Sequence, residues 1–117
     1  ALNDSSADRT TGGIGLAAYV TTSGLTTAST YGNFTKPTGG SYADITLTDP
    51  AFTVTGGVAT VASQDFLADT TDFNEDIYGY QLYFKDGTTN KAFGYDPYSG
   101  APLTVLAGET YQVDLSV

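Results

Sequence analysis

The sequence predicts an all-β protein: a single β-sandwich of about eight short strands with a jelly-roll-like arrangement. Its 117 residues include 20 threonines, nine tyrosines and 14 glycines. Branched and aromatic side chains favour strands, whereas glycine favours turns, and no segment has the period of a helix. An immunoglobulin-like sandwich is the alternative, although the Trp and Cys that mark that fold are absent from this chain.

Alternating side chains predict strands near both ends of the domain. Residues 111–117 alternate apolar and polar positions, which is typical of a strand with one face in water. Residues 14–20 instead carry small or apolar side chains at nearly every position. We therefore expect this strand to be covered on both faces or to pack against a neighbouring chain.

Two adjacent glycines predict the register of a first hairpin. A Gly56-Gly57 loop can adopt the positive φ values of a type I′ turn. This loop pairs residues 52–55 with residues 58–61, so that Phe52 opposes Val61 and Thr55 opposes Val58.

A second hairpin joins a strand that begins near Ile77 to a strand that follows residue 88. Its loop is either 86–87 or 87–88, and we prefer 87–88 because apolar residues then oppose each other. The expected pairs are Leu82 with Phe93 and Tyr80 with Tyr95, with both Leu82 and Phe93 buried.

The remaining segments complete the predicted organisation. Residues 43–48 alternate like a strand before Pro50, and residues 103–105 precede a turn at 107–109. Residues 22–41 are rich in Thr, Ser and Gly, which predicts a long tethered loop. Residues 1–13 predict a polar N-terminal arm that is ordered only against another subunit, and residues 14–117 form the single sandwich domain.

The charge of the chain excludes two classes of partner. Thirteen acidic and four basic side chains give a net charge of −9, which repels nucleic acid and anionic membranes. No run of apolar residues is long enough to span a bilayer. The chain contains no methionine, so we expect an initiator or a longer leader to have been removed before Ala1.

The residue types also argue against catalysis. The chain has no His and no Cys, which excludes Ser-His triads and thiol chemistry. A carboxylate pair could hydrolyse glycosides, but such a site needs a substrate cleft that a small sandwich without Trp hardly offers. We therefore expect a protein that is not an enzyme and has no cofactor.

One acidic stretch is a weak candidate for a Ca²⁺ site, because carboxylate oxygens are the ligands that Ca²⁺ prefers. Its spacing does not match an EF-hand, and the simpler interpretation is a solvated loop whose acidic residues serve as turn and capping groups. The candidate residues are Asp65, Asp69, Asp72, Glu75 and Asp76.

Aromatic residues form a stripe on the strand that begins near Ile77. Tyr78, Tyr80, Leu82 and Phe84 share one face, and Tyr83 lies on the other. Such a stripe could stack on sugars, but it more often belongs to the core or to a subunit interface. The residues that we expect at contacts between subunits are Leu2, Tyr19, Tyr83 and Tyr98.

The order of elements from Tyr42 onward resembles a group of small β-rich proteins encoded among the structural genes of tailed bacteriophages. The resemblance rests on strand and turn patterns: residues 42–47, the 52–60 hairpin, Tyr78-Gly79-Tyr80, and the segment from Ala101-Pro102-Leu103 to Leu115. Where that group often carries a Trp, after the Tyr-Gly-Tyr hairpin, this chain has Phe93-Gly94-Tyr95.

The resemblance implies a virion component on the outer capsid surface. The expected role is a capsid decoration or cement protein that bridges capsomers, with the major capsid protein as partner and a homotrimer as the functional form. One alternative is a phage tail component. Another is a secreted or surface-displayed β-sandwich module that binds carbohydrate or Ca²⁺.

Overall fold

The computed structural model of the protein describes residues 13–47, 52–86 and 89–115. These residues form an almost entirely β, sandwich-like structure, which confirms the predicted fold class. The arm predicted for residues 1–13, including Leu2, lies outside the described residues except for Gly13. The strands are β1 (Ile14–Tyr19), β2 (Ile45–Leu47), β3 (Phe52–Thr55), β4 (Val58–Val61), β5 (Gln64–Leu67), β6 (Gly79–Asp86), β7 (Thr89–Pro97) and β8 (Thr110–Val113).

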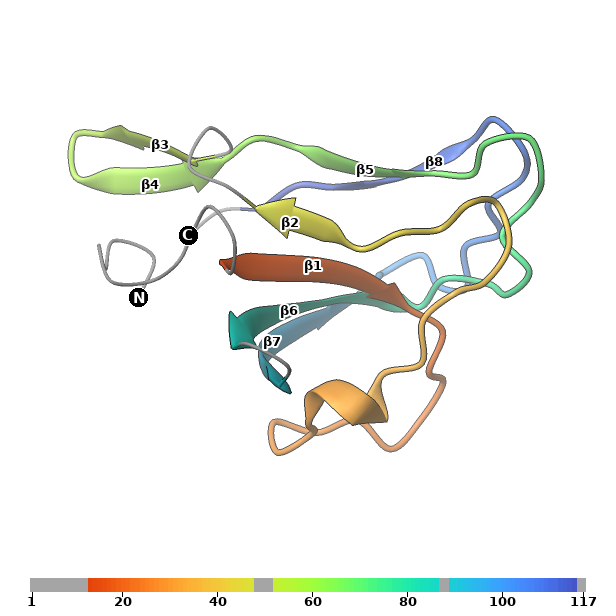
Figure 1. Ribbon diagram of the computed structural model, residues 1–117, viewed down its shortest axis with the longest axis horizontal. Helices are drawn as coiled ribbons and strands as arrows, with labels where there is room; N and C mark the ends of the chain where they lie inside the picture. Colours follow the sequence, from red (N-terminus) through yellow and green to blue (C-terminus); the bar gives the residue numbers. More distant parts are fainter. Residues whose placement is uncertain (1–12, 48–51, 87–88, 116–117) are drawn as a thin grey trace.

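The strands form one four-stranded antiparallel sheet, in the order β2-β1-β6-β7, and two separate pairs, β3–β4 and β5–β8. Figure 1 shows the two pairs above the four-stranded sheet, with the β3–β4 hairpin extending beyond one end. A jelly roll has two sheets of comparable size. Here the second layer is divided into two pairs, so the jelly-roll resemblance is limited to the sandwich arrangement.

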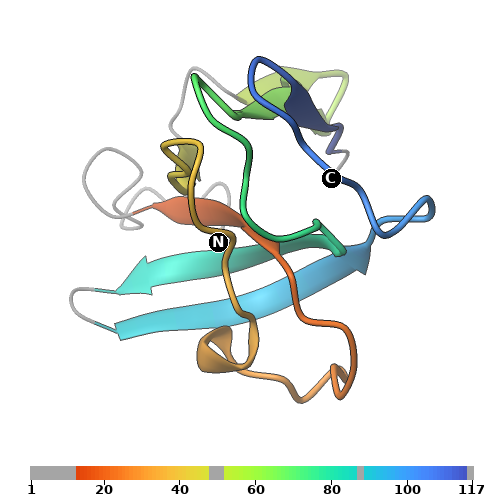
Figure 2. The same cartoon turned by 90° about the vertical axis from the view of Figure 1, so that its right-hand side faces the viewer.

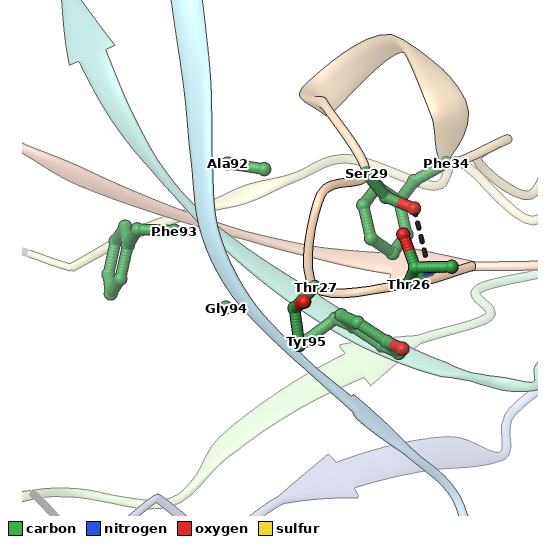
Figure 3. Close-up of a pocket in the computed structure, with 8 residues that line it drawn as sticks. All are labelled: Thr26, Thr27, Ser29, Phe34, Ala92, Phe93, Gly94 and Tyr95. Carbon is green, nitrogen blue, oxygen red and sulfur yellow. Dashed lines mark hydrogen bonds between the residues drawn. The ribbon is translucent and has the colours of Figure 1, made fainter.

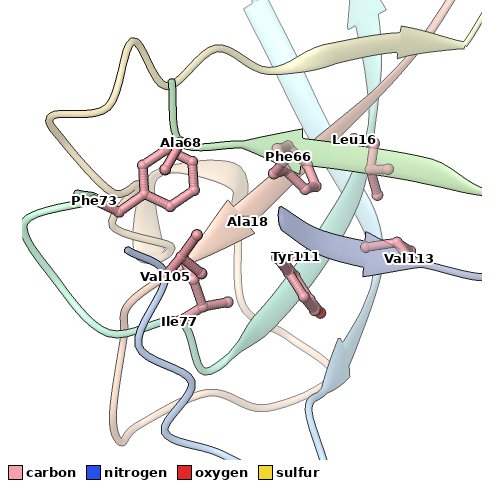
Figure 4. Close-up of a cluster of buried hydrophobic side chains, with 9 residues drawn as sticks. All are labelled: Leu16, Ala18, Phe66, Ala68, Phe73, Ile77, Val105, Tyr111 and Val113. Atoms are coloured by element: carbon pink, nitrogen blue, oxygen red, sulfur yellow. The ribbon is translucent and has the colours of Figure 1, made fainter. Parts of the chain in front are cut away.

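The main core lies between the β5–β8 pair and the four-stranded sheet. Figure 4 shows aromatic and aliphatic side chains from both layers meeting there. Strand β8 places Tyr111 and Val113 in this core and leaves Gln112 exposed, which confirms the predicted alternation for residues 111–113. The strand ends at Val113, earlier than predicted, and residues 116–117 lie outside the described residues. The buried cluster comprises Leu16, Ala18, Phe66, Ala68, Phe73, Ile77, Val105, Tyr111 and Val113.

Strand β1 is buried at all six positions, as the sequence predicted for a strand covered on both faces. Leu16 and Ala18 face the main core. On the other face the ring of Tyr83 lies over Gly15, where an added Cβ would be 2.1 Å from a ring carbon. Position 15 must therefore be glycine for the Tyr83 ring to lie against this face of the sheet.

The first part of the long loop predicted at residues 22–41 covers the face of the sheet that lies away from β5 and β8 (Figure 2), whereas its end, residues 38–41, is hydrogen-bonded to residues 69–75. Its middle forms a single 3-10 turn, η1 (Tyr31–Asn33), in which the Asn33 side chain accepts a hydrogen bond of 2.7 Å from the Thr30 N–H. Phe34 anchors the loop, since its buried ring packs edge-on against the ring of Tyr19, with 5.2 Å between the ring centroids.

The first hairpin has the predicted register. Strands β3 and β4 pair Phe52 with Val61 and Thr55 with Val58. Gly56 and Gly57 have φ values of +60° and +80°, which side chains with a Cβ rarely adopt.

The second hairpin departs from the prediction at one position. Strands β6 and β7 pair Asp86 with Thr89, so the strands flank the predicted 87–88 loop, whose residues lie outside the described ranges. A β-bulge at Phe93 then shifts the register, and Leu82 pairs with Gly94 instead of Phe93. By the same shift Tyr80 pairs with Asp96, and Tyr95 pairs with Gln81.

The bulge also changes the environment of Phe93. We predicted a buried side chain, but Phe93 is 46% exposed and stacks on Phe84 at 4.3 Å between ring centroids. As the extra residue of the bulge, Phe93 has no pairing partner on β6, and its ring packs on Phe84 instead of joining the buried core. Leu82 remains partly buried against the main core.

Candidate interaction surfaces

The β3–β4 hairpin carries one of several groups of exposed apolar side chains among the described residues. Val54 and Val58 are 61% and 57% exposed, whereas Val61, at the base of the hairpin, is buried with Ile14 and Leu47. Residues 52–61 contain no charged side chain. We call residues 52–61 the hairpin surface.

The second surface lies at the end of the sandwich away from the hairpin (Figure 1). Leu67 and Leu106 are about half exposed there. Leu67 is the last residue of β5, and Leu106 lies in the turn that precedes β8. The two segments are joined by a hydrogen bond of 2.7 Å from the Gly108 N–H to the Ala68 carbonyl. We call Leu67 and Leu106 the leucine surface.

Carboxylates border the leucine surface and hold its turns in place. Glu109 accepts a hydrogen bond of 3.0 Å from the Leu106 N–H, and Asp72 accepts one of 2.8 Å from the Ala107 N–H. Asp69 accepts hydrogen bonds from Ser41 and from the Thr70 N–H. The hydrogen bond from Ser41 is the main cause that lowers the pKa of Asp69.

The acidic residues that were weak Ca²⁺ candidates do not come together. Asp69 and Asp72 hold the turns described above, and Asp65 is an exposed residue of β5. Glu75 accepts hydrogen bonds from the backbone and side chain of Thr38, and Asp76 accepts one from Thr104. Among the described residues no group of three acidic side chains could hold a metal ion. The structure therefore favours the simpler interpretation of turn and capping residues.

The predicted contact residues differ in accessibility. Leu2 lies outside the described residues. Tyr19 and Tyr83 are 2% and 3% exposed, because the long loop covers them, so their side chains are not surface groups of this subunit. Tyr98 has an accessible side chain, with its ring 5.8 Å from that of Tyr111.

The aromatic stripe of β6 belongs mainly to the core. Tyr80 and Leu82 pack against the main cluster, and Phe84 packs against the cluster of Ile14, Leu47 and Val61. This placement favours the core interpretation over a platform for sugars.

A shallow hollow of about 230 Å³ lies between the long loop and β7. Figure 3 shows Phe93 turned away from it, while Tyr95 and hydroxyl side chains of the loop border it. Ser29 accepts a hydrogen bond of 2.8 Å from the Thr26 N–H, so this hydroxyl already shapes the loop. The hollow is lined by Thr26, Thr27, Ser29, Phe34, Ala92, Phe93, Gly94 and Tyr95.

Sequence reasoning missed a polar cluster around Asp44 that fastens the long loop to the sheet. The Asp44 carboxylate accepts hydrogen bonds from the Tyr42 hydroxyl at 2.8 Å, the Tyr83 hydroxyl at 2.7 Å and the Lys36 amine at 2.5 Å. The Tyr42 hydroxyl in turn accepts a hydrogen bond of 2.9 Å from the Ala18 N–H of β1. Asp44 thus connects the loop with β1 and β6.

Lys36 keeps its charge in this cluster. Burial lowers the pKa of its amine, but hydrogen bonds with Asp44 and Tyr31 outweigh that effect and leave the pKa above its ordinary value. The amine also lies 4.9 Å from the centroid of the Tyr31 ring, within the range of a cation–π contact. The cluster therefore combines an ion pair with aromatic packing.

Burial raises the pKa of several tyrosine hydroxyls. The pKa of Tyr19 rises to about 12, mainly because the ring is desolvated and also because Tyr95 and Asp96 are nearby. Desolvation is likewise the largest cause of the raised pKa values of Tyr42, Tyr83 and Tyr111.

These shifts predict a loss of stability in alkali. A group whose pKa is higher in the folded than in the unfolded protein contributes fully below the unfolded value. That contribution is lost as the pH rises through the folded value. We therefore expect the free energy of unfolding to fall from about pH 10, the unfolded pKa of tyrosine, through pH 12. Urea denaturation at a series of pH values measures this fall, and ionisation of all nine tyrosines near pH 10 in the folded protein would contradict it.

No protein-family model, curated protein or solved structure matches this chain. Within the part of the chain that the structure describes, no helix is long and apolar enough to cross a membrane.

Proposed function

We propose that this protein is a structural component of a bacteriophage virion, a decoration or cement protein that bridges capsomers on the outer capsid surface. One observation carries the proposal: the sandwich exposes apolar side chains at two opposite ends, on the hairpin surface and on the leucine surface. A bridging protein needs at least two contact surfaces. The resemblance of the sequence to small phage structural proteins supports the same role.

The hairpin surface suits a protein that works in an assembly. An isolated two-stranded ribbon is marginally stable in water, and here Val61 is the hairpin side chain that joins a buried cluster. Contact with another subunit would cover Val54 and Val58 and add to the stability of the ribbon.

The leucine surface suits attachment to a shell. Its two leucines supply apolar contact area, and the carboxylates of Asp69, Asp72 and Glu109 lie beside them. Carboxylates of this kind would face basic residues of the major capsid protein. A homotrimer would present three copies of the surface at once, and simultaneous binding of three weak contacts supplies avidity at a local three-fold position.

The proposal predicts how attachment depends on salt. Because apolar contacts dominate, we expect the affinity for the shell to fall by less than about tenfold as ionic strength rises to about 1 M, where charges are strongly screened. Cosedimentation of the protein with decoration-free particles measures this dependence. Complete release by salt would contradict an attachment dominated by Leu67 and Leu106.

Variants separate the leucine surface from the rest of the molecule. Leu106→Ser should weaken attachment, because it removes a half-exposed apolar side chain from the contact. Val54→Thr is the matched control, since it removes exposed apolar surface at the other end. Equal loss of attachment in the two variants would argue against a shell contact through the leucine surface.

A further inference from the structure

The free edges of the β3–β4 hairpin differ from the edges of the four-stranded sheet. Strand β3 is paired only with β4 among the described residues, so each strand has one edge without a partner strand. An uncovered edge presents N–H and C=O groups that can pair with another chain. Proteins that stay monomeric usually protect such edges with charges, proline, bulges or short strands.

The edge strands of the four-stranded sheet carry these protections. Strand β7 has the bulge at Phe93, the charged residues Lys91 and Asp96, and Pro97 at its end. At the opposite edge, β2 is only three residues long.

The four-residue strands of the hairpin lack the other protections. Residues 52–61 contain no charged residue and no proline, and β3 and β4 pair without a register shift. Its residues are threonine, valine and other small or apolar types that favour strands. We infer that these edges are covered in the functional form of the protein.

We propose that the hairpin pairs edge to edge with a second copy of this chain, through the backbone of β3 and β4. Charge restricts where a second copy can bind. Each copy carries a net charge of −9, so two copies repel each other except where they meet through an uncharged segment. The hairpin is such a segment, and it extends away from the acidic body (Figure 1). A basic shell protein would instead be attracted to the carboxylates.

The register identifies which residues offer free backbone groups. In a hairpin with a two-residue loop, the pair that closes the loop is hydrogen-bonded within the hairpin, and the next pair points its N–H and C=O groups outward. Thr55 and Val58 close this loop, so Val54 and Ala59 form the outward pair. These two residues are the expected sites of pairing between copies.

Light scattering of the purified protein tests the proposal without any virus particle. We expect a mass of at least twice the 12.2 kDa of one chain at high concentration, with association strengthened by salt because salt screens the repulsion between copies. Val54→Pro removes an outward N–H and should raise the dissociation constant about tenfold or more. Val54→Thr keeps the N–H and should weaken association much less than Val54→Pro.

Two further measurements guard against misfolding of the proline variant. The near-ultraviolet circular dichroism of the tyrosines should be unchanged in Val54→Pro. Val58→Glu keeps every N–H, adds a like charge to the exposed edge and should also weaken association. Hydrogen exchange should slow at the amides of residues 54 and 59 as concentration rises.

Three outcomes would overturn the proposal. They are a monomer at every concentration, association that Val54→Pro and Val58→Glu leave intact, and fast exchange at residues 54 and 59 in the oligomer. A monomer whose attachment to particles is lost in Val54→Pro would show that a strand of the shell protein pairs with the hairpin instead. Because the assay contains no particle, association can succeed even where the proposed virion role fails.

Discussion

Phe66→Ala should destabilise the protein by about 3–5 kcal/mol, the range for truncating a large aromatic residue in a core. The Phe66 side chain is 2% exposed and stacks between the rings of Tyr42 and Tyr111, at centroid distances of 5.6 and 6.0 Å. Truncation of Phe66 opens a cavity that the rings of Tyr42 and Tyr111 cannot easily fill. The Tyr42 hydroxyl is hydrogen-bonded to Asp44, and the Tyr111 ring packs against Tyr98. Urea denaturation of the purified variant measures the change.

The adjacent residue provides a matched control. Leu67 follows Phe66 on β5 but points to the other face and is 53% exposed. Leu67→Ala should therefore change the free energy of unfolding by less than about 0.5 kcal/mol, although it should weaken attachment to the shell. Similar losses of stability in the two variants would mean that the β5–β8 pair does not cover the core as described.

Asp44→Ala should cost about 2–3 kcal/mol, because it removes the acceptor shared by Lys36, Tyr42 and Tyr83. The hydroxyls of the partly buried Tyr42 and the buried Tyr83 lose their acceptor, at a cost of about 1 kcal/mol each or somewhat more. The ion pair itself adds little, since the Lys36 side chain is still a third exposed. Thermal or urea unfolding of the variant measures the total loss in the free energy of unfolding.

Two companion variants define the role of Asp44. Asp44→Asn keeps an acceptor oxygen and should lose less stability than Asp44→Ala. Asp65→Ala removes an exposed carboxylate and should change stability by less than about 0.5 kcal/mol. If Asp44→Ala resembles Asp65→Ala, the long loop is held by its aromatic anchors and not by the polar cluster.

Local patterns explain the parts of the fold that the sequence predicted. The Gly56-Gly57 pair determines both the turn type and the register of the first hairpin, because positive φ values at two successive residues favour a type I′ turn. The small and apolar residues of 14–19 predicted a strand buried on both faces. In each case the residues that predict the structure are close together in the sequence.

The bulge in β7 was missed although the sequence carries a signal for it. An isolated glycine within a strand often marks a bulge, and Gly94 immediately follows the extra residue Phe93. Matching apolar residues across the hairpin instead favoured an uninterrupted register. The preference for burying Phe93 thus outweighed the correct local signal.

The Asp44 cluster could not be predicted from local patterns. Lys36 and Asp44 are eight positions apart with no helix or strand between them, and Tyr83 is 39 positions beyond Asp44. The three side chains meet because the long loop folds back over the sheet. The roles of the acidic residues likewise depend on turns that are distant in the sequence, such as Asp72 with Ala107.

The two apolar ends together define how the protein would work on a capsid. The hairpin surface would join copies to one another, and the leucine surface would join them to the shell. The acidic remainder would face solvent and keep the free protein soluble. The two contacts should respond oppositely to salt, since screening strengthens association of like-charged copies and weakens attachment to a basic shell.

Cryo-electron microscopy of the virus particle that carries this protein tests the central claim most directly. The proposed role predicts density for the sandwich on the outer capsid surface, in groups of three between capsomers, with the leucine surface toward the shell. Density found only on the tail, or no density on any particle, would contradict the assignment to the capsid.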